Sequence, residues 1–137
     1  MDIAWRWSEE STCSHLNVGA VLAQHERTIA SGFNGAPPGL PHCNHDDSAG
    51  YIPCDNTNHA EGNAIAFAAR YPISTAGATL YTTHSPCKVC AGLIISAGIV
   101  RVVYGDVYLT DGRGAAGILW LEAAGLLVDA YTERMKG

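Results

Sequence analysis

Hydrophobic and polar positions alternate along this chain in a pattern that predicts nine secondary-structure elements. Continuous apolar runs such as Val18–Ala23 are typical of strands buried on both faces. The alanine-rich segment His59–Arg70 favours a helix, and Pro72 lies just beyond its end. In chain order we expect a helix, two strands, and then helix and strand in alternation. The expected bounds are 1–13, 18–23, 28–33, 59–70, 78–82, 87–96, 99–104, 115–124 and 126–131.

This order of elements predicts the fold class. The first two strands are separated by the short polar segment Gln24–Arg27, which indicates a hairpin. The later strands alternate with helices and therefore predict right-handed crossovers between parallel strands. We expect an α/β fold built on a five-stranded mixed sheet. The 137 residues contain no internal repeat or linker, so a single domain over 1–137 is expected.

Composition narrows the possible partners and location. The net charge is −5, with only 8 Lys and Arg and no basic run, which argues against binding of DNA or RNA but allows a mononucleotide. No apolar run reaches the roughly 18 residues of a membrane span. The mixed, acidic start is unlike a signal peptide, and the odd count of 5 cysteines argues against a disulfide framework. We therefore expect a cytoplasmic protein with no membrane association.

Two short motifs carry the chemistry. His59-Ala60-Glu61 is followed 25 residues later by Pro86-Cys87-Lys88-Val89-Cys90. The Cys-x-x-Cys pair places two thiolates on one face of a first helical turn. His59 as a third ligand would leave a tetrahedral zinc with one open position, which is the catalytic arrangement. Glu61 lies too close to His59 to be a fourth ligand and suits a carboxylate that moves protons.

Each motif has a simpler explanation when taken alone. A Cys-x-x-Cys pair is often half of a structural zinc site or a redox pair, and His-Ala-Glu occurs by chance in many helices. A structural zinc does not explain Glu61, and a redox pair does not explain His59. Together the motifs match the H-x-E…P-C-x-x-C pattern of zinc deaminases.

Beyond the metal motif, the chain resembles the deoxycytidylate (dCMP) deaminases of the cytidine deaminase superfamily. The resemblance implies a three-layer α-β-α sandwich, hydrolysis of dCMP to dUMP and ammonia, and assembly into hexamers. The Gly-Phe-Asn-Gly segment followed by His-Cys is similar to the dCMP branch in particular. The matching pieces are Val18–Val21, Ser31–Gly35, His42-Cys43, His59–Ile65, Thr83–Ala91 and Gly98–Tyr104.

The mechanism that these residues predict is hydrolytic deamination. His59, Cys87 and Cys90 bind zinc, and a zinc-activated water attacks C4 of the cytosine ring. Glu61 protonates N3, then passes a proton to the amine, which leaves as ammonia. The product carries uracil.

The resemblance also implies substrate contacts through Asn34, Ala60, Ser85 and Tyr108. Each has another possible explanation: Asn34 suits a turn, and Tyr108 suits simple packing. His84, beside Ser85, is equally compatible with loop polarity. For the 5′-phosphate no single residue stands out; the candidate donors are Arg70, Arg113 and Lys88.

Regulation and a second metal are further expectations from the resemblance. Allosteric dCTP activation and dTTP inhibition, with Mg²⁺, would involve Gly32, Phe33, Asn34, Gly35 and Arg70. A second, structural zinc would involve Cys13, Cys43 and Cys54, with His42, His45 or His15 completing the site. Buried, inert thiols are the alternative to this second site.

Three other functions remain open from the sequence. The nearest is deamination of free cytidine, deoxycytidine or another aminated base such as guanine. A tRNA or DNA deaminase is disfavoured by the charge of −5. A non-catalytic, zinc-stabilised interaction module would require Glu61 to be dispensable.

Overall fold

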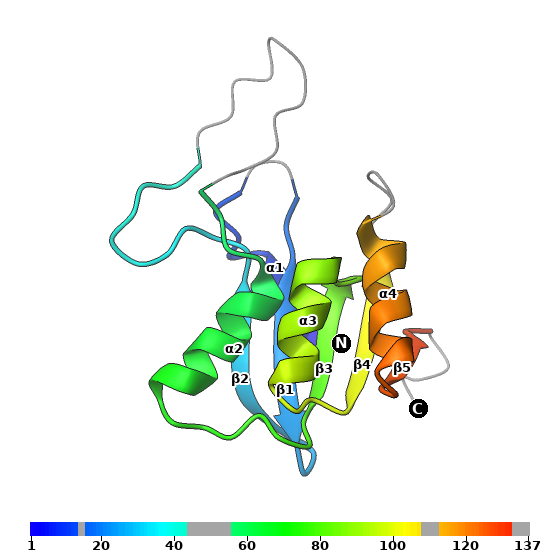
Figure 1. Ribbon diagram of the computed structural model, residues 1–137. Coiled ribbons are helices and arrows are strands. Elements are labelled where there is room, and N and C mark those ends of the chain that lie inside the picture. Colours follow the sequence, from blue (N-terminus) through cyan, green and yellow to red (C-terminus); the bar gives the residue numbers. More distant parts are fainter. Residues whose placement is uncertain (14–15, 44–55, 108–112, 133–137) are drawn as a thin grey trace.

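The computed structural model describes residues 1–13, 16–43, 56–107 and 113–132. Its elements follow the predicted order, with one five-stranded sheet in the strand order β2-β1-β3-β4-β5 (Figure 1). The predicted α/β class is confirmed. The elements are α1 (Asp2–Ser8), β1 (Gly19–Gln24), β2 (Arg27–Phe33), α2 (Ala60–Arg70), β3 (Thr79–His84), α3 (Lys88–Ser96), β4 (Arg101–Asp106), α4 (Arg113–Ala123) and β5 (Leu127–Ala130).

The sheet is mixed, as predicted. Strand β1 pairs antiparallel with β2 on one side and with β3 on the other. Strands β3, β4 and β5 are parallel, and the helices α3 and α4 connect them. The carboxyl ends of these three strands therefore lie at one edge of the sheet, the edge at which ligands of open α/β sheets bind.

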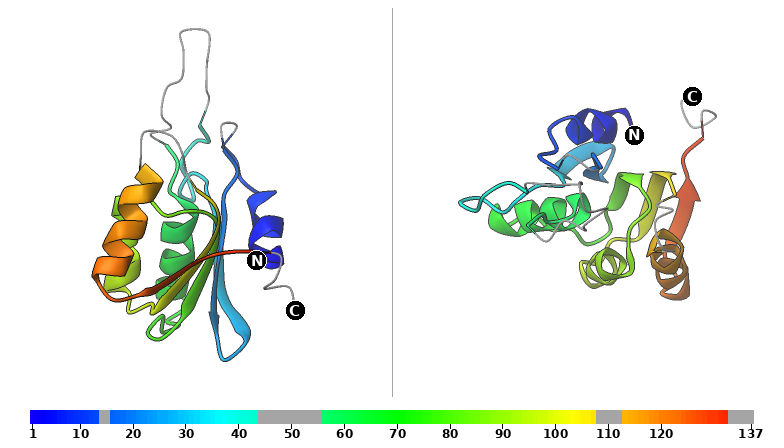
Figure 2. Two further views of the ribbon diagram at one scale, coloured as in Figure 1. Left: turned by 90° about the vertical axis from the view of Figure 1, so that its right-hand side faces the viewer. Right: turned by 90° about the horizontal axis from the view of Figure 1, so that it is seen from above.

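The elements form three layers (Figure 2). Helices α2, α3 and α4 cover one face of the sheet, and α1 covers the other. The core lies between the sheet and the three helices, where Leu22, Leu80 and Val102 meet Ile94 and Leu121. In the described ranges the longest helices have 11 residues, and no helix there is long and apolar enough to cross a membrane.

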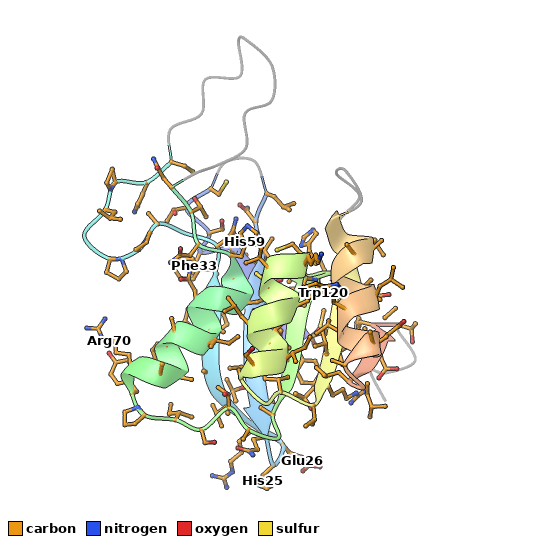
Figure 3. The ribbon with its side chains drawn as sticks, viewed as in Figure 1. His25, Glu26, Phe33, His59, Arg70 and Trp120 are labelled. Carbon is orange, nitrogen blue, oxygen red and sulfur yellow. The ribbon has the colours of Figure 1, made fainter. Side chains whose placement is uncertain are left out.

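The hairpin between β1 and β2 has a strained turn. Gln24 pairs with Arg27, which leaves a two-residue loop of His25 and Glu26. Both residues have positive φ, 52° and 63°, a conformation that usually favours glycine or asparagine. The turn lies at the end of the sheet opposite His59 (Figure 3). The strain is therefore remote from the predicted metal motif.

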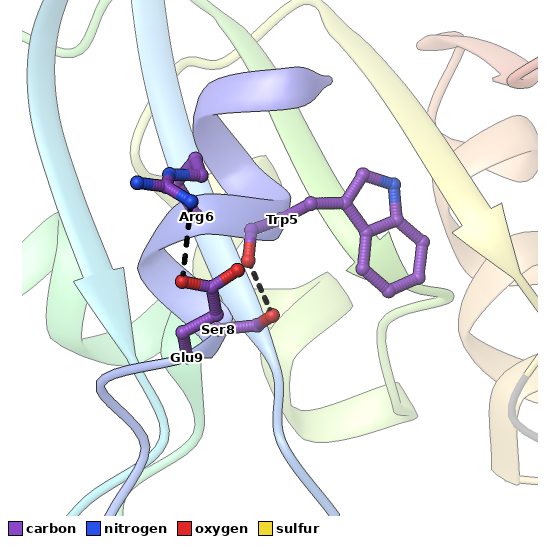
Figure 4. Close-up of polar contacts among 4 residues, drawn as sticks. All are labelled: Trp5, Arg6, Ser8 and Glu9. Carbon is purple, nitrogen blue, oxygen red and sulfur yellow. Dashed lines mark hydrogen bonds and ion pairs between the residues drawn. The ribbon is translucent and has the colours of Figure 1, made fainter.

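Helix α1 is shorter than predicted, because it ends at Ser8 rather than at residue 13. The Ser8 hydroxyl donates to the carbonyl oxygen of Trp5 at 2.6 Å, and Arg6 pairs with Glu9 at 3.5 Å (Figure 4). Beyond this end, the Ser11 hydroxyl donates to the carbonyl oxygen of Asn34 at 3.0 Å. This tertiary contact draws the chain away from the helix axis.

Two glycines allow the close backbone contacts that position α2 and α3. A Cβ on Gly32 of β2 would lie 2.5 Å from the amide nitrogen of Ala64 and 2.6 Å from the carbonyl oxygen of Ala60. A Cβ on Gly117 of α4 would overlap the carbonyl oxygen of Pro86, directly before α3. Strand β2 thus supports the start of α2, and α4 supports the start of α3.

The substitution Gly117→Ala is expected to destabilise the protein by about 1–3 kcal/mol, the usual effect of forcing extra atoms into a packed contact. Either α4 or the segment at Pro86 would have to move. Urea unfolding with two-state analysis measures the free energy of unfolding.

The control is Gly92→Ala in α3, where an added Cβ would meet Trp120 at an ordinary 3.8 Å. Replacing a helical glycine by alanine at such a position should be neutral or stabilising, by up to about 1 kcal/mol. Equal stability of the two variants would contradict the proposed contact.

Candidate active site

Three metal-ligand atoms converge where α2 and α3 begin. The His59 Nδ1 atom lies 3.4 Å from the Cys87 sulfur and 3.3 Å from the Cys90 sulfur, and all three side chains place a ligand atom within 4.8 Å of the others. A tetrahedral zinc with ordinary Zn–S and Zn–N bonds separates sulfur and nitrogen by roughly 3.6 Å. Two thiolates and an imidazole are also a usual zinc donor set. These residues therefore fit the predicted zinc.

Both helices begin at a ligand residue. His59 is the N-cap residue of α2, and Cys87 is the N-cap residue of α3. The Cys87 sulfur accepts a hydrogen bond of 3.5 Å from the backbone N–H of Cys90. The positive ends of two helix dipoles thus meet at the thiols, where they favour thiolate and other anions. The two helix starts therefore converge at the metal ligands.

The pKa values of the two thiols are shifted in opposite directions. A hydrogen bond from the Cys90 thiol lowers the pKa of Cys87 to about 3, whereas the same pairing and burial raise the pKa of Cys90. His59 is exposed, Cys87 half-buried and Cys90 buried. The centre is therefore open to solvent on the His59 side, and metal binding has to displace the Cys90 proton.

Glu61 lies beneath this centre, in the first turn of α2. Its side chain is only 4% exposed, and burial is the largest effect that raises the pKa of its carboxyl group. A backbone hydrogen bond and the nearby His59 act in the opposite direction. The Thr82 hydroxyl lies 3.4 Å from Glu61 Oε1. A buried carboxyl group beside an open metal site is suited to proton transfer.

The segment between β3 and α3 is held at both ends. The backbone N–H of Ser85 donates to the carbonyl oxygen of Asp106 at 2.8 Å. Ser85 and Pro86 are buried, and Gly117 packs against Pro86. Cys87 therefore leaves a fixed backbone, which limits how far its sulfur can move.

Asn34 holds the backbone near the N-terminal end of β1. Its side-chain nitrogen donates to the carbonyl oxygen of Leu16 at 2.6 Å, and its Oδ1 accepts from the N–H of Val18 at 2.8 Å. These contacts join Asn34 to a distant segment of the chain, so its structural role is a tertiary one and not the local turn considered above. They leave one proton on the nitrogen and one lone pair on the oxygen for a ligand. The substrate contact stays a prediction.

The other residues predicted near the substrate are Ala60, His84 and Tyr108. Ala60 is fully buried at the first position of α2, beside the metal ligand His59. His84 lies between the Thr83 hydroxyl, 2.9 Å from its Nδ1 atom, and the Trp5 ring, and burial lowers its pKa. Tyr108 lies outside the described residues.

The candidate donors to the 5′-phosphate lie on three different helices. Arg70 is exposed at the far end of α2, about 15 Å along the helix from His59, and its guanidinium lies near the Tyr71 ring (Figure 3). The Lys88 ammonium lies 4.3 Å from the centre of the Trp120 ring. Arg113 begins α4, and its side chain is outside the described part of the chain.

Part of the predicted second zinc site is described. The Cys43 thiol lies 3.7 Å from the carbonyl oxygen of Thr12, which brings it near buried Cys13. Cys54, His45 and His15 lie outside the described residues. Among the described residues, the group of three converging His, Cys, Asp or Glu side chains is His59, Cys87 and Cys90. The second zinc stays a prediction.

Thr82 and Gly117 are site residues that the sequence patterns did not single out. Thr82 is a fully buried polar residue of β3, opposite Ala20 and Tyr104 in the neighbouring strands. Its position two residues before His84 in a buried strand was the available signal, but only the packing of α2 shows that it meets Glu61. In the sequence, nothing distinguishes Gly117 from an ordinary helical glycine.

Comparisons with known proteins agree with this site. The family model for the cytidine and deoxycytidylate deaminase zinc-binding region matches residues 1–106. ComE operon protein 2 of Bacillus subtilis is 43% identical over 102 residues, which cover 73% of this chain and 53% of that protein; the chain thus spans about half the length of this relative. Deoxycytidylate deaminase of Enterobacteria phage T2 is 33% identical over 158 residues, covering 87% of this chain and 84% of that protein.

A solved structure is similar over almost the whole chain. It is the dCMP deaminase of cyanophage S-TIM5 in complex with dCMP and dUMP, with a TM-score of 0.82, 31% identity, and coverage of 95% of this chain and 92% of that one. The matched range, residues 1–106, contains His59, Glu61, Cys87 and Cys90. The chain therefore belongs to the cytidine and deoxycytidylate deaminase family.

Proposed function

We propose that this protein is a zinc-dependent enzyme that hydrolyses dCMP to dUMP and ammonia. The observation that carries the proposal is the buried carboxyl group of Glu61 beneath an open group of three metal ligands. Further support comes from the deoxycytidylate deaminase of phage T2 and from the cyanophage enzyme that was solved with dCMP and dUMP. The product dUMP would supply thymidylate synthesis.

The ligand set and Glu61 would divide the chemistry between them. A zinc ion held by His59, Cys87 and Cys90 would lower the pKa of a bound water from about 15.7 towards about 7. Glu61 would accept a proton from this water and deliver one to N3 of the cytosine ring. Once the oxygen has added to C4, Glu61 would take the second proton from the new C4 hydroxyl group and pass it to the amino group. Cleavage of the C4–N bond would then release ammonia and leave the C4 carbonyl of uracil. The burial of Glu61 favours its protonated form and so suits the donating steps.

Substrate contacts are proposed for Asn34, Ala60, Ser85 and Tyr108. Asn34 retains one donor and one acceptor for the sugar or base, and Ala60 and Ser85 flank the metal ligands along the chain. A mononucleotide fits the net charge of −5 better than a polynucleotide does.

The direct test is ammonia release from dCMP and from deoxycytidine at equal concentration. We expect dCMP to react roughly 10-fold faster or more, because a phosphate-binding site leaves its donors unpaired with the nucleoside. Glu61→Ala should lower the rate about 10²–10⁴-fold while zinc content is unchanged.

Glu122→Ala is the matched control, an exposed helical glutamate on α4, and should keep the wild-type rate. Equal rates with both substrates would instead assign the chain to nucleoside deaminases. Normal turnover by Glu61→Ala would leave a zinc-stabilised, non-catalytic module.

We also propose allosteric regulation, with dCTP as activator and dTTP as inhibitor, through Gly32, Phe33, Asn34 and Gly35, with Arg70 and Mg²⁺. Hydrogen bonds link this segment to residues next to His59. Gly35 pairs with Asn58, the residue before His59, through backbone hydrogen bonds of 3.0 and 3.2 Å. The Asn63 side chain donates to the Phe33 carbonyl oxygen at 2.8 Å. A nucleotide bound at this segment could therefore shift the start of α2.

Initial rates at subsaturating dCMP with Mg²⁺ test this regulation. We expect dCTP to raise the rate and dTTP to lower it, with typical coupling of about 5- to 150-fold. The same concentration of dATP serves as the control for metal chelation and ionic strength. A rate that is the same with all three nucleotides would rule the regulation out.

A homo-hexamer with a second zinc is the assembly we propose. Large apolar side chains are exposed on the helical face of the sheet, which supports burial between subunits. These residues are Phe67, Tyr71, Val89, Leu93, Leu119 and Trp120. Native mass spectrometry should give six subunits with two zinc ions each. A monomer with one zinc would contradict both parts.

A further inference from the structure

Thr82 provides the Glu61 carboxyl group with a neighbour that the mechanism above does not use. Thr82 is fully buried, and its hydroxyl oxygen lies 3.4 Å from Glu61 Oε1 and 3.0 Å from the carbonyl oxygen of His84. The hydroxyl group thus lies, with Glu61, next to the apolar core between the sheet and the helices. Leu80, two residues earlier on the same face of β3, belongs to the hydrophobic core.

A hydroxyl group at this position is not needed for packing. Valine has the shape of threonine and would fill the same volume without a polar atom to satisfy. Burying a hydroxyl group is unfavourable unless it is hydrogen-bonded, so the contacts with Glu61 and His84 have to offset this cost.

The Thr82 hydroxyl suits a partner that gains and loses a proton. It has one proton and two lone pairs, and it can rotate. It can donate to the Glu61 carboxylate, or it can donate to the His84 carbonyl oxygen and accept from a protonated Glu61. Both forms of the carboxyl group that the proposed reaction requires therefore have the same hydrogen-bond partner.

We propose that Thr82 is a positioning residue, whose hydroxyl group fixes the orientation of the Glu61 carboxyl group toward the substrate side of the metal centre. Its second contact, with the His84 carbonyl oxygen, links this orientation to the segment that carries Cys87. The proposal rests on the proposed function in assigning proton transfer to Glu61. The placement of the carboxyl group is tested separately.

Two substitutions separate the hydroxyl group from the packing of the side chain. Thr82→Val keeps the shape and removes the hydroxyl; Thr82→Ser keeps the hydroxyl and removes a methyl group. We expect Thr82→Val to lower kcat for dCMP by about 3- to 30-fold, the loss expected for one hydrogen bond, with KM within about 2-fold of wild type. Thr82→Ser should recover most of this kcat, although its melting temperature falls below that of Thr82→Val.

The decisive result is that the order of the two variants in kcat is the opposite of their order in melting temperature. If Thr82 only stabilised the fold, activity would follow stability, and Thr82→Ser would be the slower variant. Zinc content, measured by metal analysis, should be the same in all three proteins, because none of the ligands is changed.

Crystal structures of the zinc-loaded proteins give a readout that does not depend on turnover. We expect the Glu61 carboxyl group to turn or occupy two conformers in Thr82→Val and to keep one orientation in Thr82→Ser. An unchanged Glu61 with wild-type kcat in Thr82→Val would overturn the proposal while dCMP deamination stands. A Glu61 displaced only in Thr82→Val, in a protein that does not deaminate dCMP, would support the positioning role and refute the proposed function.

Discussion

The meeting of the first turns of α2 and α3 is the constraint on which the site depends. His59 and Cys87 are both N-cap residues, so a small shift of either helix would separate the sulfur and nitrogen atoms that now lie 3.3–3.4 Å apart. Each helix is held by backbone contact with a neighbour that lacks a side chain, Gly32 for α2 and Gly117 for α3. The precision of the metal centre therefore originates in packing outside it.

The same arrangement creates two environments within one helical turn. His59 faces solvent, whereas Glu61, two residues later, points into the layer between α2 and the sheet and is 4% exposed. Burial raises the pKa of the carboxyl group, and the helix start and nearby imidazole limit that rise. A carboxyl group balanced in this way can hold or release a proton beside an accessible metal site.

The local parts of this design could be predicted from sequence. Spacing within His59-Ala60-Glu61 and Cys87–Cys90 determines which atoms share a helical turn, and the alternation of apolar runs determined the order of strands and helices. The length of α1 could not be predicted, because a contact between Ser11 and Asn34, far apart in the chain, ends it. The role of Thr82 depends on how α2 lies on β3, which no local pattern encodes. The single domain over 1–137 and the cytoplasmic location stay predictions.

The residues proposed for substrate contact differ from those proposed for the metal chemistry, which explains why family membership is easier to establish than specificity. The ligands and Glu61 belong to helix starts, where backbone geometry is regular and spacing is informative. Of the proposed substrate contacts, Asn34 directly follows β2 and Ser85 directly follows β3, and Asn34 shows the consequence. Its amide already holds the backbone at Leu16 and Val18, so the proposed substrate contact would have to use the donor and acceptor that these bonds leave. Residues with two such roles can be found from sequence, but the division between the roles is determined by tertiary structure.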